Sequence, residues 1–566
     1  MCYRFRGQVR RKMSKKSRNK RIENLPKDGP KKKSLGDYRY IYWASTLIVI
    51  LFTVFIRLRL LEIPLERDEG EFAYMGQLML QGIPPYLISY NMKLPGIYSA
   101  YALIMLLFGK SAAGIHLGFI IINVATIILV FLIAARLFNH FTAFVAGSSY
   151  AILSLSPTVY GTSAHATHFV LLPALGGLLI MLKSIETDKT KYVFWSGLLL
   201  GLSFLMKQPG IFFVIFASVY LFYNSFRSPN FTLHLLLKKE LVFLIGAISP
   251  FAITCAFLYF AGVFDKFWFW TFSYASQYVS LISPSEGFKI FLDQAAKVIG
   301  KFYSLWGMTV LGIGFLLGGK IERGQRIFVL GFLLFSLLAL CPGFYFREQY
   351  FILLLPAVSL LIGIGLNGLK RSFFSLHPKL QFVPMLLFIA VLIPGLFHYR
   401  LFFFEWTPHQ VSRAIYGLNP FPESIEVARY IKAHSQKEDK IAVFGSEPQI
   451  YFYANRHSAT GYIYTYSLME NQPFALRMQK EMVEEVEKAQ PNYLIYVYVP
   501  ESWLIEPSSE RYLIKWSDKY CQKNFDLVGV VDIISNRRTE YRWENEAKSY
   551  SLQSPNYLFV FKRKPT

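Results

Sequence analysis

Cysteine and charged residues are both scarce in this sequence. Charged side chains make up 17% of its 566 residues, and its four cysteines lie far apart. Such spacing provides neither a disulfide framework nor the ligands of a structural metal site. A soluble protein that binds nucleic acid needs a more highly charged surface, so we expect no nucleic-acid partner. No glycine-rich phosphate loop follows a predicted strand, and nothing indicates a nucleotide-sugar donor.

Hydrophobic residues dominate the chain instead. They account for 53% of it, with 52 Phe and 36 Tyr, which excludes intrinsic disorder for most of its length. The 60 Lys and Arg outnumber the 36 Asp and Glu, which gives a formal net charge of +24. This composition predicts a membrane protein, and the position of the positive charge then becomes a guide to its topology.

The charge is distributed unevenly. Residues 1–40 contain 15 basic and 3 acidic residues and no apolar run, which predicts a basic, disordered cytoplasmic tail. This tail is too long and too charged to begin a cleavable signal peptide. Residues 401–566 contain 20 basic and 20 acidic residues. The remaining excess lies in residues 41–400, where apolar segments dominate.

The apolar segments of residues 41–400 predict eleven membrane crossings. They lie at 41–61, 96–109, 114–137, 141–160, 166–184, 192–206, 209–224, 240–264, 299–318, 326–342, 349–368 and 380–398. A spanning helix needs about 20 apolar residues. The segment at 96–109 is shorter than this and is broken by Pro95 and Gly96, so we expect it to lie at the interface.

Basic residues in the connections predict the orientation. With the tail inside the cell, the cytoplasmic connections contain Arg136, Lys183, Lys189, Lys191, Arg227, Lys238, Lys239, Lys320, Arg323, Arg326, Lys370, Arg371 and Lys379. Short cytoplasmic loops are enriched in Lys and Arg. We therefore predict a multi-pass protein of the cell (inner or plasma) membrane, with a cytoplasmic N-terminus. The odd number of crossings places the C-terminal domain outside the cytoplasm.

Residues 401–566 have the pattern of a small α/β domain. Residues 424–435 have helical spacing with Ser424 at the start, and 473–490 have the pattern of a Glu-rich amphipathic helix. Strands are predicted at 440–445, 493–499, 527–534 and 557–561. Because strands and helices alternate, we expect neighbouring strands to be parallel.

The longest outer loop of the membrane part, residues 62–113, is acidic where it begins. Its first residues include Glu66, Asp68, Glu69 and Glu71. In one interpretation these residues belong to a solvated linker and cap a helix that begins near Phe72. In the other, interleaved aromatic and aliphatic residues hold the loop on the membrane surface. Partial desolvation there raises the pKa of a carboxylate and suits it to act as a base.

Three basic residues on the same side have no obvious structural role: Lys93, Lys207 and Arg347. Taken singly, each is explained by a long side chain that extends to the membrane interface. Taken together, and facing the same leaflet as the acidic cluster, they indicate a site that holds an anionic lipid phosphate.

These segments resemble a known family of membrane enzymes. The stretch from Asp68 to Tyr101, with DEGEFAY, IPPY, NMKLPG and AYA, is similar to the first outer loop of bacterial family 39 glycosyltransferases. That family is related to protein O-mannosyltransferases and to the aminoarabinose transferase that modifies lipid A. The similarity continues through 197–210, 267–279, 346–366 and 443–456. It therefore covers most of the chain after residue 40.

The resemblance implies the GT-C fold. In this fold residues 41–400 form a multispan α-helical catalytic domain of about 11 transmembrane helices, with interfacial helices in 62–113, and residues 401–566 form an extracytoplasmic α/β domain. The implied activity is that of an integral membrane glycosyltransferase. It moves a sugar from a polyprenyl-phosphate donor to an extracytoplasmic lipid, glycan or protein. An inverting transfer of this kind needs a carboxylate base and cations on the leaving phosphate.

The resemblance also assigns roles to residues. Asp68 is the implied catalytic carboxylate with Glu69 as its helper, and Lys93, Arg347 and Lys207 are the implied ligands of the donor phosphate. Further substrate contacts are expected from Glu71, Tyr74, Tyr345, Tyr350, His165 and His168.

The second outer loop departs from the lipid A enzyme. Where that enzyme has an Asp, this chain has GTSAHATHF, with Thr167 near the position. His165 and His168 are the ionisable groups nearby. Acceptor orientation, metal binding and interfacial packing are all open roles for them, and a divalent metal is compatible with the sequence but not required by it.

Two other classes of protein compete with an enzyme. A polyprenyl-lipid or glycolipid flippase or transporter usually places ionisable groups near the bilayer midplane, whereas these mid-span positions are nearly free of charge. A membrane-anchored sensor would leave the acidic, aromatic first loop without a purpose, and anchoring does not need eleven spans.

Overall fold

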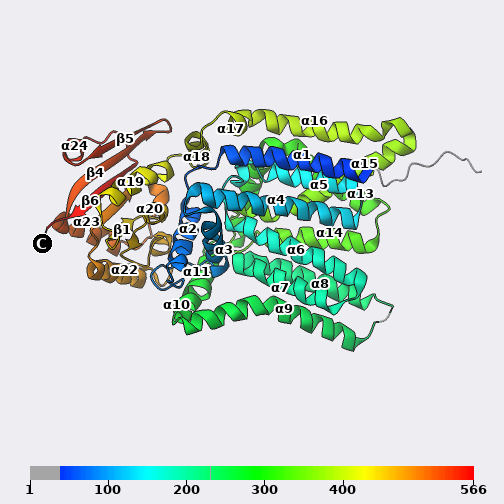
Figure 1. The fold of residues 1–566 in the computed structure, drawn as a ribbon, viewed down its shortest axis with the longest axis horizontal. Coiled ribbons are helices and arrows are strands. Elements are labelled where there is room, and N and C mark those ends of the chain that lie inside the picture. The colour runs from blue at the N-terminus through cyan, green and yellow to red at the C-terminus, as the bar shows by residue number, and fades with distance from the viewer. Residues whose placement is uncertain (1–37, 230, 566) are drawn as a thin grey trace, which may run out of the picture.

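The protein has a helical membrane part with an α/β domain at one end (Figure 1). This computed structural model describes residues 38–229 and 231–565. Residues 1–37 of the predicted basic tail lie outside the described residues. The long helices lie side by side along one direction, and the chain enters the α/β domain only after the last of them (Figure 1).

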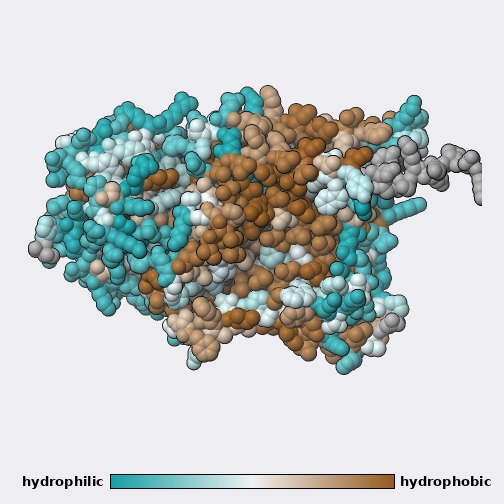
Figure 2. All heavy atoms as spheres, in the orientation of Figure 1, coloured by the Kyte–Doolittle hydropathy of each residue, from teal (hydrophilic) through white to brown (hydrophobic). Residues whose placement is uncertain are grey.

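Apolar helices form the membrane part. They are α1 (Tyr38–Arg59), α4 (Ala112–Leu137), α5 (His140–Leu153), α6 (Ala166–Thr187), α7 (Thr190–Met206), α8 (Ile211–Phe226), α9 (Leu233–Phe260), α12 (Pro284–Ile299), α13 (Tyr303–Gly318), α14 (Arg323–Leu338), α15 (Leu355–Leu376) and α16 (Val383–His398). Figure 2 shows hydrophobic residues gathered in a broad band over this part and hydrophilic residues over the α/β domain. The chain is a multi-pass membrane protein.

Seven helical stretches of the described residues are long and apolar enough to cross a membrane. They are 39–59, 112–137, 166–187, 208–226, 233–260, 284–318 and 378–398. Helices α5, α7, α14 and α15 occupy the other four predicted spans. Three of these are only 14 to 17 residues long, and α15 carries Lys370 and Arg371. The predicted interfacial segment forms the 14-residue helix α3 (Pro95–Phe108).

Small residues set the close packing of α7 against α9. A Cβ atom at Gly197 would overlap the carbonyl oxygen of Phe243, and one at Gly201 would overlap that of Ala247. From the other side, a Cβ atom at Gly246 would overlap the carbonyl oxygen of Phe194. Small residues allow helix backbones to approach closely in a membrane, where hydrophobic burial adds little between helices. These glycines therefore determine the distance between the two helices.

A methyl group at Gly201 should loosen this contact. We expect Gly201→Ala to destabilise the protein by about 1–3 kcal/mol, because the added carbon has no space against α9. Thermal unfolding of the purified protein in detergent measures the effect. The matched control is Gly307→Ala on α13, where an added Cβ meets no atom within 4 Å. Equal melting temperatures for the two variants would contradict the packing argument.

Short helices connect the spans on the side that faces the α/β domain. They are α2 (Arg67–Leu80), α10 (Phe264–Trp268), the π-helical turn η3 (Phe269–Tyr274), α11 (Ala275–Val279) and the 3-10 helices η1 (Pro157–Val159), η2 (Gln208–Gly210) and η5 (Glu348–Leu353). Helix η4 (Gly300–Phe302) lies on this side as well, because the Thr158 hydroxyl of η1 donates to the carbonyl oxygen of Val298 just before it, whereas η6 (Pro378–Phe382) lies on the opposite side, between α15 and α16.

The C-terminal domain contains a six-stranded mixed sheet in the order β2-β1-β3-β6-β4-β5. Its strands are β1 (Lys440–Phe444), β2 (His457–Ser458), β3 (Tyr493–Tyr498), β4 (Phe525–Ser535), β5 (Arg538–Trp543) and β6 (Tyr557–Arg563). Its helices are α17 (Arg400–Phe404), α18 (Pro408–Tyr416), α19 (Phe421–His434), α20 (Gln449–Ala454), α21 (Tyr466–Met469), α22 (Ala475–Ala489), η7 (Pro500–Ser502), α23 (Tyr512–Asn524) and α24 (Asn545–Ser549). The four predicted strands and both predicted helices are present.

The expectation of parallel neighbours holds for only half of the sheet. Strand β1 pairs in parallel with β2 and β3, whereas β6 pairs antiparallel with β3 and β4, and β5 pairs antiparallel with β4. The physical reason is the connection: β4 and β5 form a hairpin, and a tight hairpin requires antiparallel strands. Helix α19 also begins at Phe421, one turn before the predicted Ser424, which instead bonds the carbonyl oxygen of Pro420.

The two faces of the sheet pack on different partners. On one face Ile441 and Ile495 join the buried cluster that contains Phe72 of α2 and Tyr98 of α3. Alternate residues of a strand point to opposite faces. The other face therefore presents Phe444, which packs in a second cluster with Trp270 and Met478. The first outer loop is thus covered by the C-terminal domain.

A buried ion pair links α2 to this domain. The Arg67 guanidinium donates to Glu447 Oε1 at 2.6 Å and to the carbonyl oxygen of Ser446 at 2.6 Å. The side chains of Arg67 and Glu447 are 9% and 0% exposed. Removing one partner of a buried ion pair leaves the other charge buried and uncompensated, which destabilises the folded protein.

Removing the carboxylate should loosen the domain. We expect Glu447→Ala to cost about 3–5 kcal/mol, because Arg67 is left buried without its counter-ion. Thermal unfolding and limited proteolysis near residues 404–408 measure the loss. The control is Glu426→Ala, whose partner Arg429 is 69% exposed and whose loss should cost about 0–1 kcal/mol. A Glu447→Ala protein as stable as this control would show that the pair does not secure the domain.

Candidate active site

Helix α2 begins five residues before the predicted start at Phe72. Its first residue is Arg67, and Glu66 is the N-cap. Glu66 Oε1 accepts from the backbone N–H of Glu69 at 2.9 Å, and Glu69 Oε2 accepts from the backbone N–H of Glu66 at 3.2 Å. This reciprocal capping box satisfies the free amides at the helix start. The acidic cluster therefore lies inside the first turns of a helix, with its side chains pointing in different directions.

A cavity of about 320 Å³ lies between the membrane part and the C-terminal domain. Its residues come from both parts: Glu66, Arg67, Asp68, Tyr90, Asn91, Met92, Lys93, Tyr160, His165, Trp270, Tyr274, Tyr278, Arg347, Glu348, Gln349, Tyr350, Tyr416, Asn419, Phe421, Tyr464, Tyr466, Ser467, Glu470, Glu501 and Leu504. Ligand sites are typically concave pockets at such boundaries, with a few convergent polar groups.

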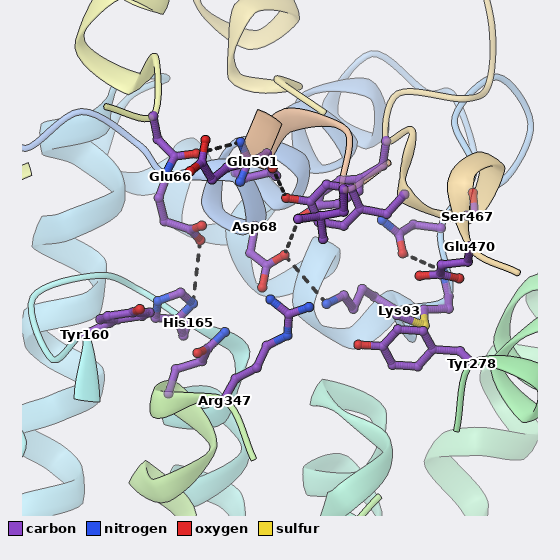
Figure 3. Close-up of a pocket in the computed structure, with 18 of the residues that line it drawn as sticks. Glu66, Asp68, Lys93, Tyr160, His165, Tyr278, Arg347, Ser467, Glu470 and Glu501 are labelled. Carbon is purple, nitrogen blue, oxygen red and sulfur yellow. Dashed lines mark hydrogen bonds and ion pairs between the residues drawn. The ribbon is translucent and has the colours of Figure 1, made fainter. Parts of the chain in front are cut away.

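Asp68 points into this cavity (Figure 3). Its Oδ1 lies 3.7 Å from Lys93 Nζ and accepts a hydrogen bond from the Tyr464 hydroxyl at 3.2 Å. The side chain is 19% exposed, so it is accessible from the cavity but largely shielded from bulk water. Asp68 is thus held between a cation of the first outer loop and a tyrosine of the C-terminal domain.

Lys93 is positioned by bonds to its own loop. Its carbonyl oxygen accepts from the Tyr86 hydroxyl at 2.6 Å, and the neighbouring Met92 carbonyl accepts from Gln208 Nε2 at 2.8 Å. The second bond ties the Lys93 loop to the turn that follows α7, which also carries Lys207. Two of the three predicted outer cations therefore come from adjoining loops.

Arg347 and Lys207 approach the same region from the spans. Arg347 precedes η5, lines the cavity, and points toward Asp68 and Lys93 in Figure 3. It forms no ion pair with any described carboxylate. Lys207 lies behind the wall of the cavity, with its Nζ 4.0 Å from the ring centroid of Tyr350, which lines it. Burial, reinforced by Lys93 and Arg347, lowers the pKa of Lys207 to about 7.

The cations decide the charge of Asp68. Burial opposes ionisation of its carboxyl, but the positive charges of Lys93 foremost, and then of Lys207 and Arg347, hold its pKa well below the usual range. Asp68 is therefore a carboxylate at neutral pH. Lys93 and Arg347 both lie beside this carboxylate, and Arg347 has no ion-pair partner among the described residues, so it is available to an anionic ligand.

Glu69 lies behind the cavity rather than in its wall. It is fully buried, and its Oε1 accepts from His116 Nε2 at 3.1 Å and from the backbone N–H of Ala164 at 2.6 Å. These bonds join α2 to α4 and to the second outer loop. The structure thus gives Glu69 a set of partners that holds α2 in place.

Glu71 and Tyr74 also lie outside the cavity. The Tyr98 hydroxyl donates to Glu71 Oε1 at 2.7 Å, while Oε2 has no hydrogen-bond partner among the described residues. Tyr74 accepts from the backbone N–H of Ser458 and stacks on Tyr451, with ring centroids 5.2 Å apart. Tyr74 is therefore part of the contact between α2 and the C-terminal domain.

The remaining expected contacts divide between the cavity and its surroundings. Tyr350 and His165 line the cavity. Tyr345 stacks on the cavity residue Tyr278 at 4.5 Å between ring centroids. His168 is buried within the bundle with its ring centroid 4.7 Å from that of Phe119, away from the cavity wall.

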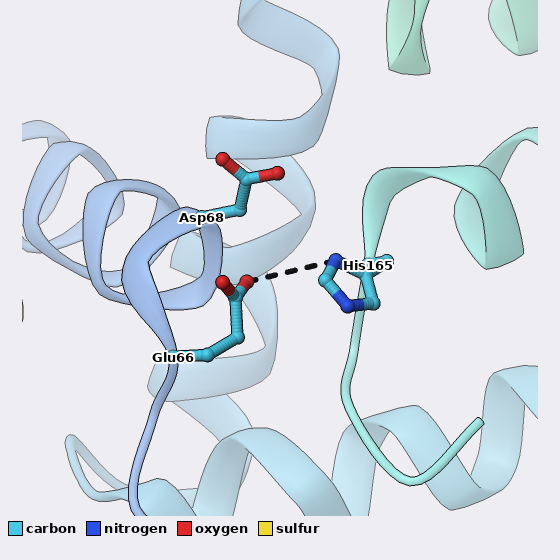
Figure 4. A group of neighbouring side chains, drawn as sticks. All are labelled: Glu66, Asp68 and His165. Carbon is cyan, nitrogen blue, oxygen red and sulfur yellow. Dashed lines mark ion pairs between the residues drawn. The ribbon is translucent and has the colours of Figure 1, made fainter. Parts of the chain in front are cut away.

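Glu66, Asp68 and His165 form a group that could hold a metal ion. One ligand atom from each lies within 4.8 Å of the others (Figure 4). The Nδ1 of His165 is 3.6 Å from Glu66 Oε1, and neither ring nitrogen has a hydrogen-bond partner among the described residues. Burial lowers the pKa of His165 to about 4, which leaves the ring neutral and able to donate a lone pair. Two carboxylates and an imidazole suit a divalent cation.

Several lining residues lie far along the sequence from the first outer loop. The C-terminal domain contributes Tyr464, Tyr466, Ser467, Glu470, Glu501 and Leu504, and the segment after α9 contributes Trp270, Tyr274 and Tyr278. One of these segments has a sequence pattern that could have indicated a binding loop. The alternation of aromatic and polar residues in IYTYS interrupts the strand and helix patterns, and such loops carry binding residues.

Comparisons with known proteins agree with this architecture. Residues 93–259 match the family described as dolichyl-phosphate-mannose-protein mannosyltransferase, and no curated protein matches the chain by sequence. The solved structure of ArnT from Cupriavidus metallidurans bound to undecaprenyl phosphate is 15% identical with a TM-score of 0.52, over 83% of this chain and 94% of that one. Oligosaccharyltransferase AglB from Archaeoglobus fulgidus, in complex with an inhibitory peptide and a dolichol-phosphate, is 11% identical with a TM-score of 0.51, over 93% and 76%.

The class of protein follows first. At such low identity the solved structures establish the fold alone, which is the GT-C fold with a C-terminal mixed α/β domain. The family match covers the segment that carries Lys93 and Lys207. Residues 93–259 match a glycosyltransferase family and the chain has the GT-C fold, so the protein is a membrane glycosyltransferase. The predicted enzyme class is confirmed.

The buried carboxyl of Glu71 should make stability depend on pH. Burial raises its pKa to about 8, so the folded protein holds a proton that the unfolded chain releases above the ordinary pKa of a glutamate. Its contribution is present in full at low pH and is lost as pH rises through about 8. We expect the wild type to lose more thermal stability between pH 6 and 9 than Glu71→Gln, and parallel curves would refute this.

Proposed function

We propose that the chain transfers a sugar from a polyprenyl-phosphate carrier to a lipid, glycan or protein acceptor outside the cytoplasm. The observation that carries the proposal is the convergence of Asp68, Lys93 and Arg347 on one shielded cavity beside the membrane part. The ArnT structure was solved with undecaprenyl phosphate and the AglB structure with a dolichol-phosphate. A lipid-linked phosphate is the anion that such a position favours.

The cations would bind the phosphate of the donor. Arg347 has no carboxylate partner among the described residues, so its guanidinium is available for two parallel bonds to phosphate oxygens. Lys93 adds a point charge from the other loop, and Lys207 contributes from behind Tyr350. These groups stabilise the charge that grows on the phosphate as the bond to the sugar breaks.

Asp68 would act as the base. It takes the proton of the acceptor hydroxyl as the acceptor oxygen forms a bond to the anomeric carbon. The bond from that carbon to the phosphate oxygen breaks, and its electron pair stays on the phosphate. The leaving group needs no proton from a second carboxyl, because the phosphate departs as an anion that the cations stabilise.

Donor binding should also tune the base. In the structure the cations lower the pKa of Asp68, which weakens it as a proton acceptor. A phosphate anion placed between Lys93 and Arg347 offsets their charge, so the pKa of Asp68 rises once the donor is present. The base therefore becomes stronger when the substrate has arrived.

A divalent cation is compatible with the site. Glu66, Asp68 and His165 would hold it, and when bound it supplies positive charge beside the reacting groups. The neutral ring of His165 offers a lone pair in the direction of Glu66 (Figure 4). Metal dependence of the activity is therefore a property to measure with the purified protein.

The orientation follows the basic connections. We place the N-terminus in the cytoplasm and count eleven crossings, with α5, α7, α14 and α15 added to the seven longer spans. Helix α3 is the interfacial one. The connections opposite the cavity then carry the excess of Lys and Arg, which is the expected pattern for a cytoplasmic side. The α/β domain lies outside.

The proposal predicts a strong effect at Asp68. We expect Asp68→Asn to reduce transfer from a radiolabelled polyprenyl-phosphate sugar by about 10²–10⁴-fold, because the acceptor proton has no base. Donor binding should persist in this variant. The control is Asp518→Asn, an exposed acid of the C-terminal domain, which should transfer at the wild-type rate. Full turnover by Asp68→Asn would rule Asp68 out as the base.

Substitutions of the cations should weaken binding of the donor. We expect both Lys93→Met and Arg347→Lys to weaken binding of undecaprenyl phosphate. Arg347→Lys keeps the positive charge at this position, but a lysine cannot form the two parallel hydrogen bonds of a planar guanidinium. Wild-type donor affinity in both variants would contradict this assignment.

A further inference from the structure

The end of the cavity away from Asp68 and His165 has a different chemistry. It is lined by Trp270, Tyr274 and Tyr278 from the segment after α9, and by Ser467 and Glu470 from α21 and the residue that follows it. Figure 3 shows Tyr278, Ser467 and Glu470 grouped on the side opposite His165. This wall is aromatic and hydroxylated, with a single carboxylate.

One carboxylate oxygen of Glu470 is free to accept a hydrogen bond. Its Oε2 accepts from the Tyr274 hydroxyl at 2.5 Å, whereas Oε1 has no hydrogen-bond partner among the described residues. No described Lys or Arg lies within ion-pair distance of it. Burial raises the pKa of this carboxyl. A partly buried oxygen that faces a cavity and has no hydrogen-bond partner can accept a hydrogen bond from a ligand.

The aromatic side chains surround this carboxylate. Trp270 packs edge-on against Tyr274 with ring centroids 5.2 Å apart, and Tyr278 stacks on Tyr345 at 4.5 Å. Both tyrosines and the tryptophan lie in or directly after the π-helical turn η3, and such turns often occur at functional sites. Flat ring faces beside a hydrogen-bond acceptor provide an apolar surface and a polar group in one wall.

We infer that this wall is the subsite for the sugar of the donor, with Glu470 accepting hydrogen bonds from its hydroxyl groups. A monosaccharide offers hydroxyl donors and apolar C–H faces, which match a carboxylate and aromatic rings. This inference rests on the proposed function, because it takes the phosphate to lie at Lys93 and Arg347. Glu470 is then a specificity residue supplied by the C-terminal domain.

The two ends of the cavity adjoin each other through a short chain of contacts. The guanidinium of Arg347 lies 5.5 Å from the ring centroid of Tyr345, and Tyr345 stacks on Tyr278 at 4.5 Å. A sugar attached to a phosphate at Arg347 therefore extends into the wall that contains Tyr278 and Glu470. The lipid chain leaves the phosphate on the membrane side.

Binding measurements on the purified full chain test the subsite. The probes are undecaprenyl phosphate and a panel of undecaprenyl-phosphate hexoses and pentoses. We expect at least one sugar to increase the affinity of the wild type over the bare phosphate. Glu470→Gln should lose about tenfold or more of that increase, while its affinity for the bare phosphate stays within about twofold of wild type.

The matched control is Glu481→Gln. Glu481 accepts from the Tyr462 hydroxyl, so it forms the same kind of tyrosine–carboxylate pair in the same domain, but it does not line the cavity. It should keep the full sugar-dependent increase.

Two outcomes overturn the inference and leave the proposed function intact: a Glu470→Gln protein that keeps the increase, or a wild type that binds every carrier no better than the bare phosphate. A wild type that binds no carrier at all would overturn the proposed function, and the inference with it.

Discussion

The arrangement of the site depends on the burial of one short helix, α2, between the membrane helices and the C-terminal domain. Its capping box turns the acidic cluster into the first turn of a helix, and each charged side chain then meets a different part of the molecule. Arg67 pairs with Glu447 of the α/β domain, Glu69 holds α4 and the second outer loop, and Asp68 points into the cavity toward Lys93. Because α2 is held on several sides, the position of Asp68, the proposed base, is fixed as well.

This constraint gives the cavity its electrostatic character. Among the described residues, Asp68 is the carboxylate within ion-pair distance of Lys93, while Glu69 is committed to partners behind the cavity. The C-terminal domain closes the site, shields it from water, and contributes Tyr464 to Asp68 and Glu470 to the far wall. In such a low-dielectric setting, charges act more strongly than at an open surface. The domain is therefore part of the site rather than an appendage of the membrane helices.

Sequence patterns predicted the apolar helices, the main strands and the grouping of Asp68, Lys93 and Arg347, because long apolar runs and outer cations are local signals. They placed the start of α2 too late, since a Glu66–Glu69 capping box resembles any acidic linker. The structural partners of Glu69 and Tyr74 lie up to 384 residues away, and Glu470 lies beyond all the spans. The hydrophobic periodicity of a single sequence does not report contacts between residues so far apart. The hairpin of β4 and β5 was missed because β5, RTEYRW, is polar.

The most direct test is a structure of the full chain with undecaprenyl phosphate in a lipid nanodisc. The phosphate should lie between the Lys93 ammonium and the Arg347 guanidinium, inside the cavity that Asp68 faces, with the lipid chain running along the membrane helices. A phosphate bound elsewhere on the protein, with Lys93 and Arg347 left without it, would contradict the assignment of this cavity as the active site.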